Sequence, residues 1–239
     1  MDLNNYFTFD GITSASLDTY ISGEGTFDAP GRVYDMQIIP GRNGALALDE
    51  KRFENVEVSY PAFIGKNDGT DFETAISALR NALLSKNGYK RLTDTYHADE
   101  FRLAMFKDGL KVSPTMINRA GEFELVFNCK PQRFLTSGEE VTTFMASGTI
   151  TNPTQFDARP LIVATGTGNL TVNGVQIAIS KSPTTIDCEA MEAYNGTVSR
   201  NGDIVMTPNE FPVLSPGVNT ITLGAGITKA EITPRWWII

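Results

Sequence analysis

Short runs of β-forming residues separated by turn dipeptides fill the second half of the chain and restrict its fold more than any other feature. The clearest case is Asn173-Gly174, which stands between Leu170–Val172 and Val175–Ile177. Asn-Gly between two such runs is typical of a two-residue hairpin, because both turn positions need a positive φ. The other runs and Asn-Gly pairs of this half are Leu161–Val163, Thr184–Ile186, Asn195-Gly196, Asn201-Gly202, Ile204–Met206, Thr220–Leu223 and Glu231–Thr233. Together they predict an antiparallel β-sandwich or jelly roll without a helix.

The first half contains one convincing helix. Thr70-Asp71-Phe72-Glu73 has the spacing of a capping box, and Asn87-Gly88 supplies a stop. Between them the apolar residues recur at helical period, at Phe72, Ile76, Leu79 and Leu83. The pattern predicts a helix whose apolar face is buried.

Around this helix the apolar residues alternate as they do in half-buried strands. Phe123, Leu125 and Phe127 share one face of a predicted strand. The run Phe101–Met105 alternates in the same way, and Asp108-Gly109 after it predicts a hairpin turn towards Lys111-Val112. The first half is therefore predicted to be a β-sheet or barrel that carries one helix.

The two halves differ in charge. Charged residues are much denser before residue 137 than after it, and Thr136–Glu140 has the composition of a short polar connector. We therefore predict two domains, residues 1–137 and residues 138–239.

The chain ends on Pro234–Ile239, which contains both tryptophans and no polar tail. Chain ends are usually frayed and hydrophilic, so this one must be docked in its own sheet or on a neighbour. We predict that Arg235, Trp236 and Trp237 form a closing strand of the second domain. Adjacent strand residues point to opposite faces, so at most one tryptophan would be exposed. One exposed ring leaves open a second function, a carbohydrate-binding adhesion module acting through residues 138–239.

Composition argues against several classes of partner. The formal net charge of −8, without a Lys/Arg patch, argues against tight nucleic-acid binding. No apolar run approaches the roughly 20 residues needed to cross a bilayer. Met1–Asn5 lacks the features of a signal peptide, and the widely separated Cys129 and Cys188 are expected to be buried free thiols. Both observations fit synthesis in a cytoplasm.

We find no motif for an enzyme, a cofactor or a metal. His97 is the only histidine, no Gly-x-Ser-x-Gly accompanies it, and we expect it to be exposed or at an interface. One histidine and two distant cysteines are too few for a zinc site. Gly166-Thr167-Gly168 precedes a strand, where a phosphate loop would open a helix, so we expect a tight turn. The acidic pairs Asp99-Glu100 and Glu139-Glu140 are expected to be solvated. They therefore do not favour the paired catalytic carboxylates of a glycoside hydrolase.

Taken in order, several segments resemble the distal tail protein (Dit) family of tailed bacteriophages with long, non-contractile tails. The resemblance runs nearly end to end, and its order and spacing are more specific than any one motif. The matching segments are Phe7–Ile12, Ile38–Gly44, Phe127–Phe134, Asn152–Thr154 with Phe156 and Pro160, Pro216–Asn219 and Pro234–Trp237.

The resemblance implies a homohexameric ring that joins the tail tube to the tip or baseplate. It implies a tail-tube-like first domain that forms the ring, and a galectin-like second domain that carries receptor-binding proteins. The expected partners are other copies of the chain, a tail-tube protein, a tail-tip protein and a receptor-binding protein. The expected location is the virion tail, after synthesis in the host cytoplasm. By resemblance, Pro40, Gly41, Arg42, Asn43 and Gly44 are the candidates for a subunit or tube contact.

Overall fold

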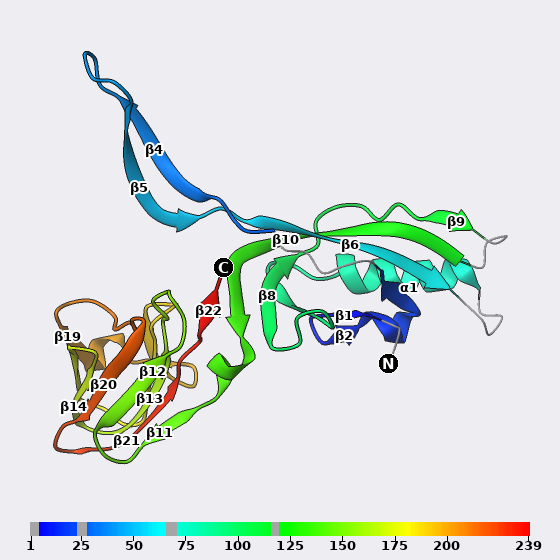
Figure 1. Cartoon of the computed structure of the whole chain (residues 1–239). Coiled ribbons are helices and arrows are strands. Elements are labelled where there is room, and N and C mark those ends of the chain that lie inside the picture. Colours follow the sequence, from blue (N-terminus) through cyan, green and yellow to red (C-terminus); the bar gives the residue numbers. More distant parts are fainter. Residues whose placement is uncertain (1–4, 23–27, 66–70, 116–119) are drawn as a thin grey trace. The chain divides into compact units, whose positions relative to one another are not determined.

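The computed structural model describes residues 5–22, 28–65, 71–115 and 120–239 (Figure 1). The chain divides into two compact units, residues up to Arg133 together with Ile239, and residues 134–238. Each unit is described by itself. The expected junction at residue 137 lies within the second unit, in the short 3-10 helix η2 (Thr136–Glu139).

The first unit is built on one antiparallel sheet. Along the sheet the strand order is β2-β1-β7-β8-β10-β6-β3, and β9 also pairs with β10. A separate ribbon consists of β4 and β5. The elements are β1 (Phe7–Phe9), β2 (Ile12–Thr13), η1 (Ser14–Leu17), β3 (Thr19–Ile21), β4 (Arg32–Ile38), β5 (Ala45–Phe53), β6 (Val56–Gly65), α1 (Phe72–Leu84), β7 (Lys90–Asp94), β8 (Glu100–Met105), β9 (Ser113–Thr115) and β10 (Ala120–Leu135).

Helix α1 forms where its pattern predicts, but its cap differs. The N-cap is Asp71, whose side chain accepts a hydrogen bond from Glu73 N at 3.2 Å. Thr70, the expected capping residue, lies outside the described residues. The buried face of the helix consists of Phe72, Ala75, Ile76, Leu79 and Leu83.

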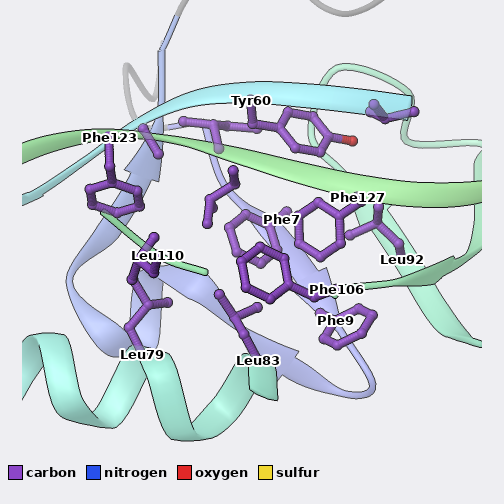
Figure 2. Close-up of a cluster of buried hydrophobic side chains, with 14 of the residues drawn as sticks. Phe7, Phe9, Tyr60, Leu79, Leu83, Leu92, Phe106, Leu110, Phe123 and Phe127 are labelled. Carbon is purple, nitrogen blue, oxygen red and sulfur yellow. The ribbon is translucent and has the colours of Figure 1, made fainter. Parts of the chain in front are cut away.

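Aromatic rings fill the space between the helix and the sheet (Figure 2). Phe127 of β10 lies among them, with its ring centroid 5.3 to 6.0 Å from those of Phe7, Phe9, Tyr60 and Phe106. These tilted and edge contacts are the arrangement that aromatic rings prefer. The predicted alternation of β10 is confirmed, because Phe123, Leu125 and Phe127 are all buried in this core.

The hairpin predicted at Asp108-Gly109 is wrong. After β8 the segment from Phe106 to Val112 has no regular structure, and β9 pairs with β10 rather than with β8. Phe106 and Leu110 are both buried in the core. Their burial contributes more than the local preference of Asp-Gly for a two-residue turn.

The second unit is a sandwich of two antiparallel sheets. Their strand orders are β11-β21-β13-β16-β17-β18 and β12-β20-β14-β15-β19, and inward residues of both sheets form one core. The predicted fold class, mainly β with one α-helix among the described residues, is confirmed. The elements are β11 (Thr142–Phe144), β12 (Gly148–Asn152), β13 (Leu161–Gly166), β14 (Gly168–Val172), β15 (Val175–Ile179), β16 (Thr184–Asp187), β17 (Glu192–Asn195), β18 (Val198–Ser199), η3 (Asn201–Asp203), β19 (Ile204–Thr207), β20 (Gly217–Leu223), β21 (Ile227–Thr233) and β22 (Trp237–Ile238).

The three Asn-Gly pairs have three different outcomes. Asn173-Gly174 closes the β14–β15 hairpin as predicted, with φ of 47° and 89°. In the β17–β18 hairpin Asn195 pairs with Val198, so the turn residues are Gly196 and Thr197. Asn201-Gly202 lies in η3 and forms no hairpin, because the Asn201 side chain accepts a hydrogen bond from Ala193 N at 2.6 Å.

Candidate interaction surfaces

The β4–β5 ribbon is the most exposed regular structure of the first unit. Within the described part of the chain these two strands pair only with each other, in the register that places Ile38 opposite Ala45 (Figure 1). Every residue of the ribbon is exposed except Val33 and Phe53, which are half-buried. The ribbon therefore contributes almost nothing to the core of its own subunit.

Large apolar side chains occupy both faces of this ribbon. Opposed strand residues share a face, so Tyr34, Met36 and Ile38 lie on one face, opposite Asp49, Ala47 and Ala45. Leu46 and Leu48 lie on the other face. Met36 is 58% exposed and Ile38 85% exposed. Exposed apolar side chains gathered on one element are typical of surfaces that interact with a protein, a membrane or a ligand.

The five interface candidates lie together in the loop at the tip of the ribbon. Arg42 N donates a hydrogen bond to Ile39 O at 3.2 Å, and Gly41 has a φ of 80°. Pro at the second position and a positive φ at the third are the requirements of a type II turn, which explains Pro40-Gly41. The whole loop from Ile39 to Gly44 is exposed, so its side chains are presented outward rather than packed on the subunit.

A bulge shapes the base of the ribbon. The register shifts between Arg32 and Tyr34, and Lys51 on the longer strand has a φ of 57°. Asp49 accepts hydrogen bonds from Lys51 N at 2.8 Å and from Arg32 Nε at 3.1 Å. The Arg32 guanidinium holds the pKa of Asp49 below its usual range. Bulges bend a strand and increase its twist, and the contacts of Asp49 with Arg32 and Lys51 N join the two strands at this bulge.

The C-terminal segment is docked in the second unit. Arg235 N donates to Gly138 O at 2.7 Å, and Leu135 N donates to Trp236 O at 2.9 Å. Trp236 is buried in the sandwich core. The residues proposed as a closing strand are thus anchored by backbone hydrogen bonds, although β22 pairs with β10 and joins neither sheet of the sandwich.

The two tryptophans have different surroundings. Trp237 is partly exposed, and its ring stacks on Phe156 with centroids 4.4 Å apart. Its Nε1 donates to Asp157 O at 2.9 Å. Arg235 binds Asp187 through both terminal nitrogens, and this guanidinium lowers the pKa of Asp187.

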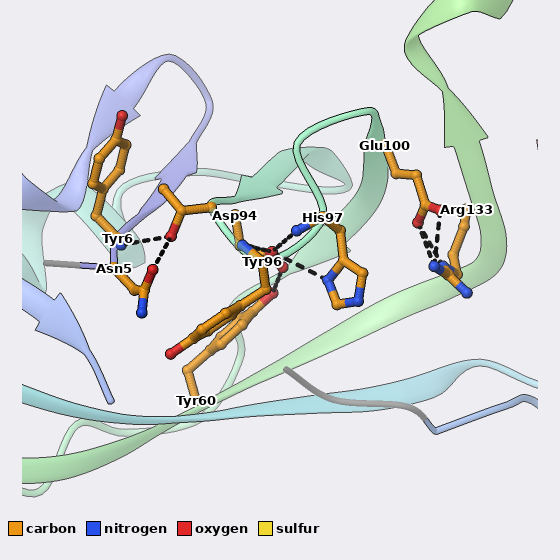
Figure 3. A network of polar contacts seen from close by, with 9 residues as sticks. Asn5, Tyr6, Tyr60, Asp94, Tyr96, His97, Glu100 and Arg133 are labelled. Atoms are coloured by element: carbon orange, nitrogen blue, oxygen red, sulfur yellow. Dashed lines mark hydrogen bonds and ion pairs between the residues drawn. The ribbon is translucent and has the colours of Figure 1, made fainter. Parts of the chain in front are cut away.

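His97 belongs to a polar network of the first unit (Figure 3). Asp94 accepts hydrogen bonds from Tyr60 Oη at 2.6 Å and from His97 N at 2.8 Å, and His97 Nδ1 lies 3.2 Å from the same carboxylate. The His97 side chain is partly buried against Asp94 and is not fully exposed, and its expected place at an interface stays a prediction. Arg133 binds Glu100 at 2.7 and 2.8 Å beside it. Burial and Asp94 together raise the pKa of Tyr60 far above its usual value.

Both cysteines are free and buried, as predicted. Burial raises the pKa of each thiol to about 12. Thiols with such a pKa are protonated at neutral pH and react poorly. In the described ranges no three His, Cys, Asp or Glu side chains are grouped as metal ligands would be. No described helix has the length and apolar character needed to span a membrane.

Comparison with solved structures shows which known fold this architecture has. The crystal structure of the Dit protein of phage SPP1 superimposes with a TM-score of 0.71, over 98% of this chain and 99% of that one, at 13% sequence identity. The chain has the fold of a Dit protein. A chain of the phage P2 baseplate in its activated conformation with Ca also superimposes on this chain, with a TM-score of 0.54, at 8% identity over 96% of this chain and 97% of that one. No family model and no curated protein sequence matches.

The sequence predicted the tip loop of this Dit fold but not the character of its flanking strands. Tyr34, Met36 and Ile38 alternate as a half-buried strand would, and nothing local distinguishes a core strand from an exposed ribbon. The exposure becomes visible only once the strand partners are known.

Proposed function

We propose that this chain is a non-enzymatic structural hub at the tip or baseplate of a bacteriophage tail. In this role it forms a homohexameric ring and joins the tail tube to the host-adhesion apparatus. The likeness in fold supports the proposal. The SPP1 Dit protein is described as a paradigm of the hub adsorption apparatus in phages that infect Gram-positive bacteria, and the second neighbour belongs to a baseplate.

The observation that carries the proposal is the β4–β5 ribbon. Its apolar side chains are exposed on both faces, and strands of this kind on a free monomer invite pairing or aggregation. A neighbour that covers Met36 and Ile38 removes apolar surface from water at about 25 cal/mol per Å². We assign the ribbon to contacts with other copies of the chain. The tip loop Pro40–Gly44 reaches either the next subunit or the tube.

The remaining partners follow from the same role. A ring around a DNA passage must not hold DNA tightly, and a net charge of −8 suits that requirement. The second unit, which is a complete sandwich with its own core, is free to carry receptor-binding or other tail-tip proteins. The proposed location is the virion tail, after synthesis in the host cytoplasm.

Ring formation tests the proposal directly. The full chain is purified, its mass is measured by size exclusion with light scattering, and particles are viewed by electron microscopy. We expect rings of six, lost on Ile38→Asp and weakened by Arg42→Ala or Gly41→Ala. Val218→Asp is the matched control, because Val218 is also strongly exposed but lies on β20 of the second unit. A monomer at every concentration, or rings indifferent to Ile38→Asp, would contradict the assignment.

A further inference from the structure

A cleft lies at the edge of the sandwich, where β17, β18 and η3 meet. Its volume is about 390 Å³, and Glu192, Tyr194, Thr197, Ser199 and Asn201 line it. This volume is within the range of about 300 to 1,000 Å³ that is usual for small-molecule sites. Tyr194 pairs with Ser199 across the β17–β18 hairpin, so the cleft follows the hairpin along its short strands.

The wall of the cleft is held in place by backbone contacts. Asn201 Oδ1 accepts from Ala193 N at 2.6 Å, and Arg200 N donates to Ala193 O at 2.7 Å. Both the N–H and the C=O of Ala193 in β17 are therefore bonded to the segment at the start of η3, and Ala193 itself is buried. The side chains that line the cleft therefore project from a fixed backbone, a condition for selective binding.

Several polar groups of the cleft are not used by the protein. Within the described part of the chain, the Glu192 carboxylate and the Tyr194 and Thr197 hydroxyls make no hydrogen bond or ion pair. Asn201 uses its oxygen on Ala193 N, which leaves its two N–H donors for a ligand. The cleft thus offers acceptors, donors and one aromatic face together.

The charges of the cleft select the class of ligand. Glu192 is the only charged residue of its lining. The nearby Arg200 is not part of the lining; its Nη1 lies 3.2 Å from Asp203, a carboxylate that Lys181 also binds, and its Nε is buried away from solvent. Phosphate, sulfate or carboxylate groups would meet a carboxylate and no cation among the residues that line the cleft. Sugar hydroxyls both donate and accept, and the C–H face of a pyranose packs on an aromatic ring.

We propose that this cleft is a binding site for a neutral saccharide, with Tyr194 as the stacking ring and Glu192 and Asn201 as the hydrogen-bonding groups. The site differs from the aromatic pair at the C-terminus. Trp236 is buried there, and Phe156 already stacks on Trp237. The proposal stands independently of the hub function, since a hub without this site would still form rings.

The test uses the full chain on an array of neutral oligosaccharides of glucose, galactose and N-acetylglucosamine, with sialylated and phosphorylated glycans alongside. Titration calorimetry then measures the best neutral ligand. We expect Tyr194→Ala to weaken its binding about tenfold or more, and Tyr194→Phe to retain most of it. Tyr6→Ala, at an exposed tyrosine that lies outside both the cleft and the ribbon, is the matched control and should bind as the unchanged chain does.

Three outcomes would overturn the saccharide site. They are no neutral ligand on the array, binding confined to anionic glycans, and neutral binding that survives Tyr194→Ala. Thermal unfolding of each variant separates loss of the site from loss of the sandwich, and Glu192→Gln repeats the test without touching the core. Ring formation, measured on the same samples, reports on the hub function separately.

Discussion

Arg235 binds Asp187 with two parallel hydrogen bonds, Nη1 to Oδ1 at 2.7 Å and Nη2 to Oδ2 at 2.9 Å. Asp187 also accepts from the backbone N–H groups of Glu189 and Ala190. This pair ties the last residues of the chain to the end of β16. Its planar, bidentate geometry is the strongest form of ion pair between side chains.

Asp187→Asn is expected to lower the free energy of unfolding of the second unit by about 1 to 3 kcal/mol at pH 7. The folded pKa of Asp187 is held below its usual range, chiefly by the hydrogen bond from Arg235. The stabilisation is therefore complete above about pH 5 and is lost as the pH falls through the lower, folded pKa. Both tryptophans belong to this unit, so their fluorescence during urea unfolding measures it.

The difference in unfolding free energy between the original chain and Asp187→Asn should accordingly shrink as the pH falls below about 5 and through the folded pKa of Asp187. Glu140→Gln, at an exposed carboxylate of the same unit, is the control and should show no such gap. A difference that stayed constant down to pH 2 would mean that the carboxylate charge does not act through Arg235.

Trp236→Ala is expected to destabilise the second unit by about 3 to 5 kcal/mol, because it leaves a large cavity in a core where Trp236 is only 5% exposed. Trp237→Ala should cost about 1 to 2 kcal/mol, since it removes a partly exposed stack and one hydrogen bond. Calorimetric unfolding compares the two. Equal costs would show that the neighbouring rings are buried alike, contrary to the structure.

Gly138→Ala is expected to destabilise the second unit by about 1 to 3 kcal/mol, because a Cβ there would lie 2.3 Å from Trp236 N. The backbone of the C-terminal segment would have to move away and release the Arg235 N to Gly138 O hydrogen bond. Gly202→Ala is the control, since a Cβ at that position meets open space. Equal melting temperatures for the two variants would refute the close approach.

Met36→Asp and Leu46→Asp, on opposite faces of the ribbon, should each leave the stability of the isolated subunit within about 0.5 kcal/mol. Each should also weaken self-association, because neighbours are expected to cover both faces. Sedimentation velocity across a concentration series measures this. Val205→Asp, at an exposed valine on β19 of the second unit, is the control, because it makes a similar change outside the ribbon. A defect in only one of the two Asp variants would show that a single face is covered.

Local signals predicted the elements whose neighbours in sequence are also their partners in space. The β14–β15 hairpin needed only Asn173-Gly174 and its flanking runs, and α1 needed only its apolar period. Asp108-Gly109 also favours a two-residue turn, yet it forms no hairpin, because Phe106 and Leu110 on either side of it are buried in the core. Turn chemistry is worth about 1 kcal/mol, and burial of two large side chains exceeds it.

Local sequence signals could not predict contacts between residues that are far apart in the chain. Arg235 and Asp187 are 48 residues apart, and no spacing rule pairs them. The cleft at Tyr194 depends on Asn201 being drawn away from a hairpin turn to bind Ala193 N. The ribbon is exposed because, among the described residues, β4 and β5 pair only with each other and not with the main sheet. Periodicity indicates that a face is apolar, but tertiary structure decides whether anything covers it.

The exposed turn at the ribbon tip also makes the peptide bond after Arg42 accessible to proteases. Arg42 lies in an exposed loop, where its backbone N–H donates to Ile39 O, and trypsin cleaves after arginine in such loops. A neighbour that covers the tip protects the bond, whereas a solitary chain offers it freely. The fraction of chains cleaved after Arg42 in a limited digestion therefore measures how many subunits are not covered by a neighbour. These unassembled subunits are degraded first wherever proteases are present.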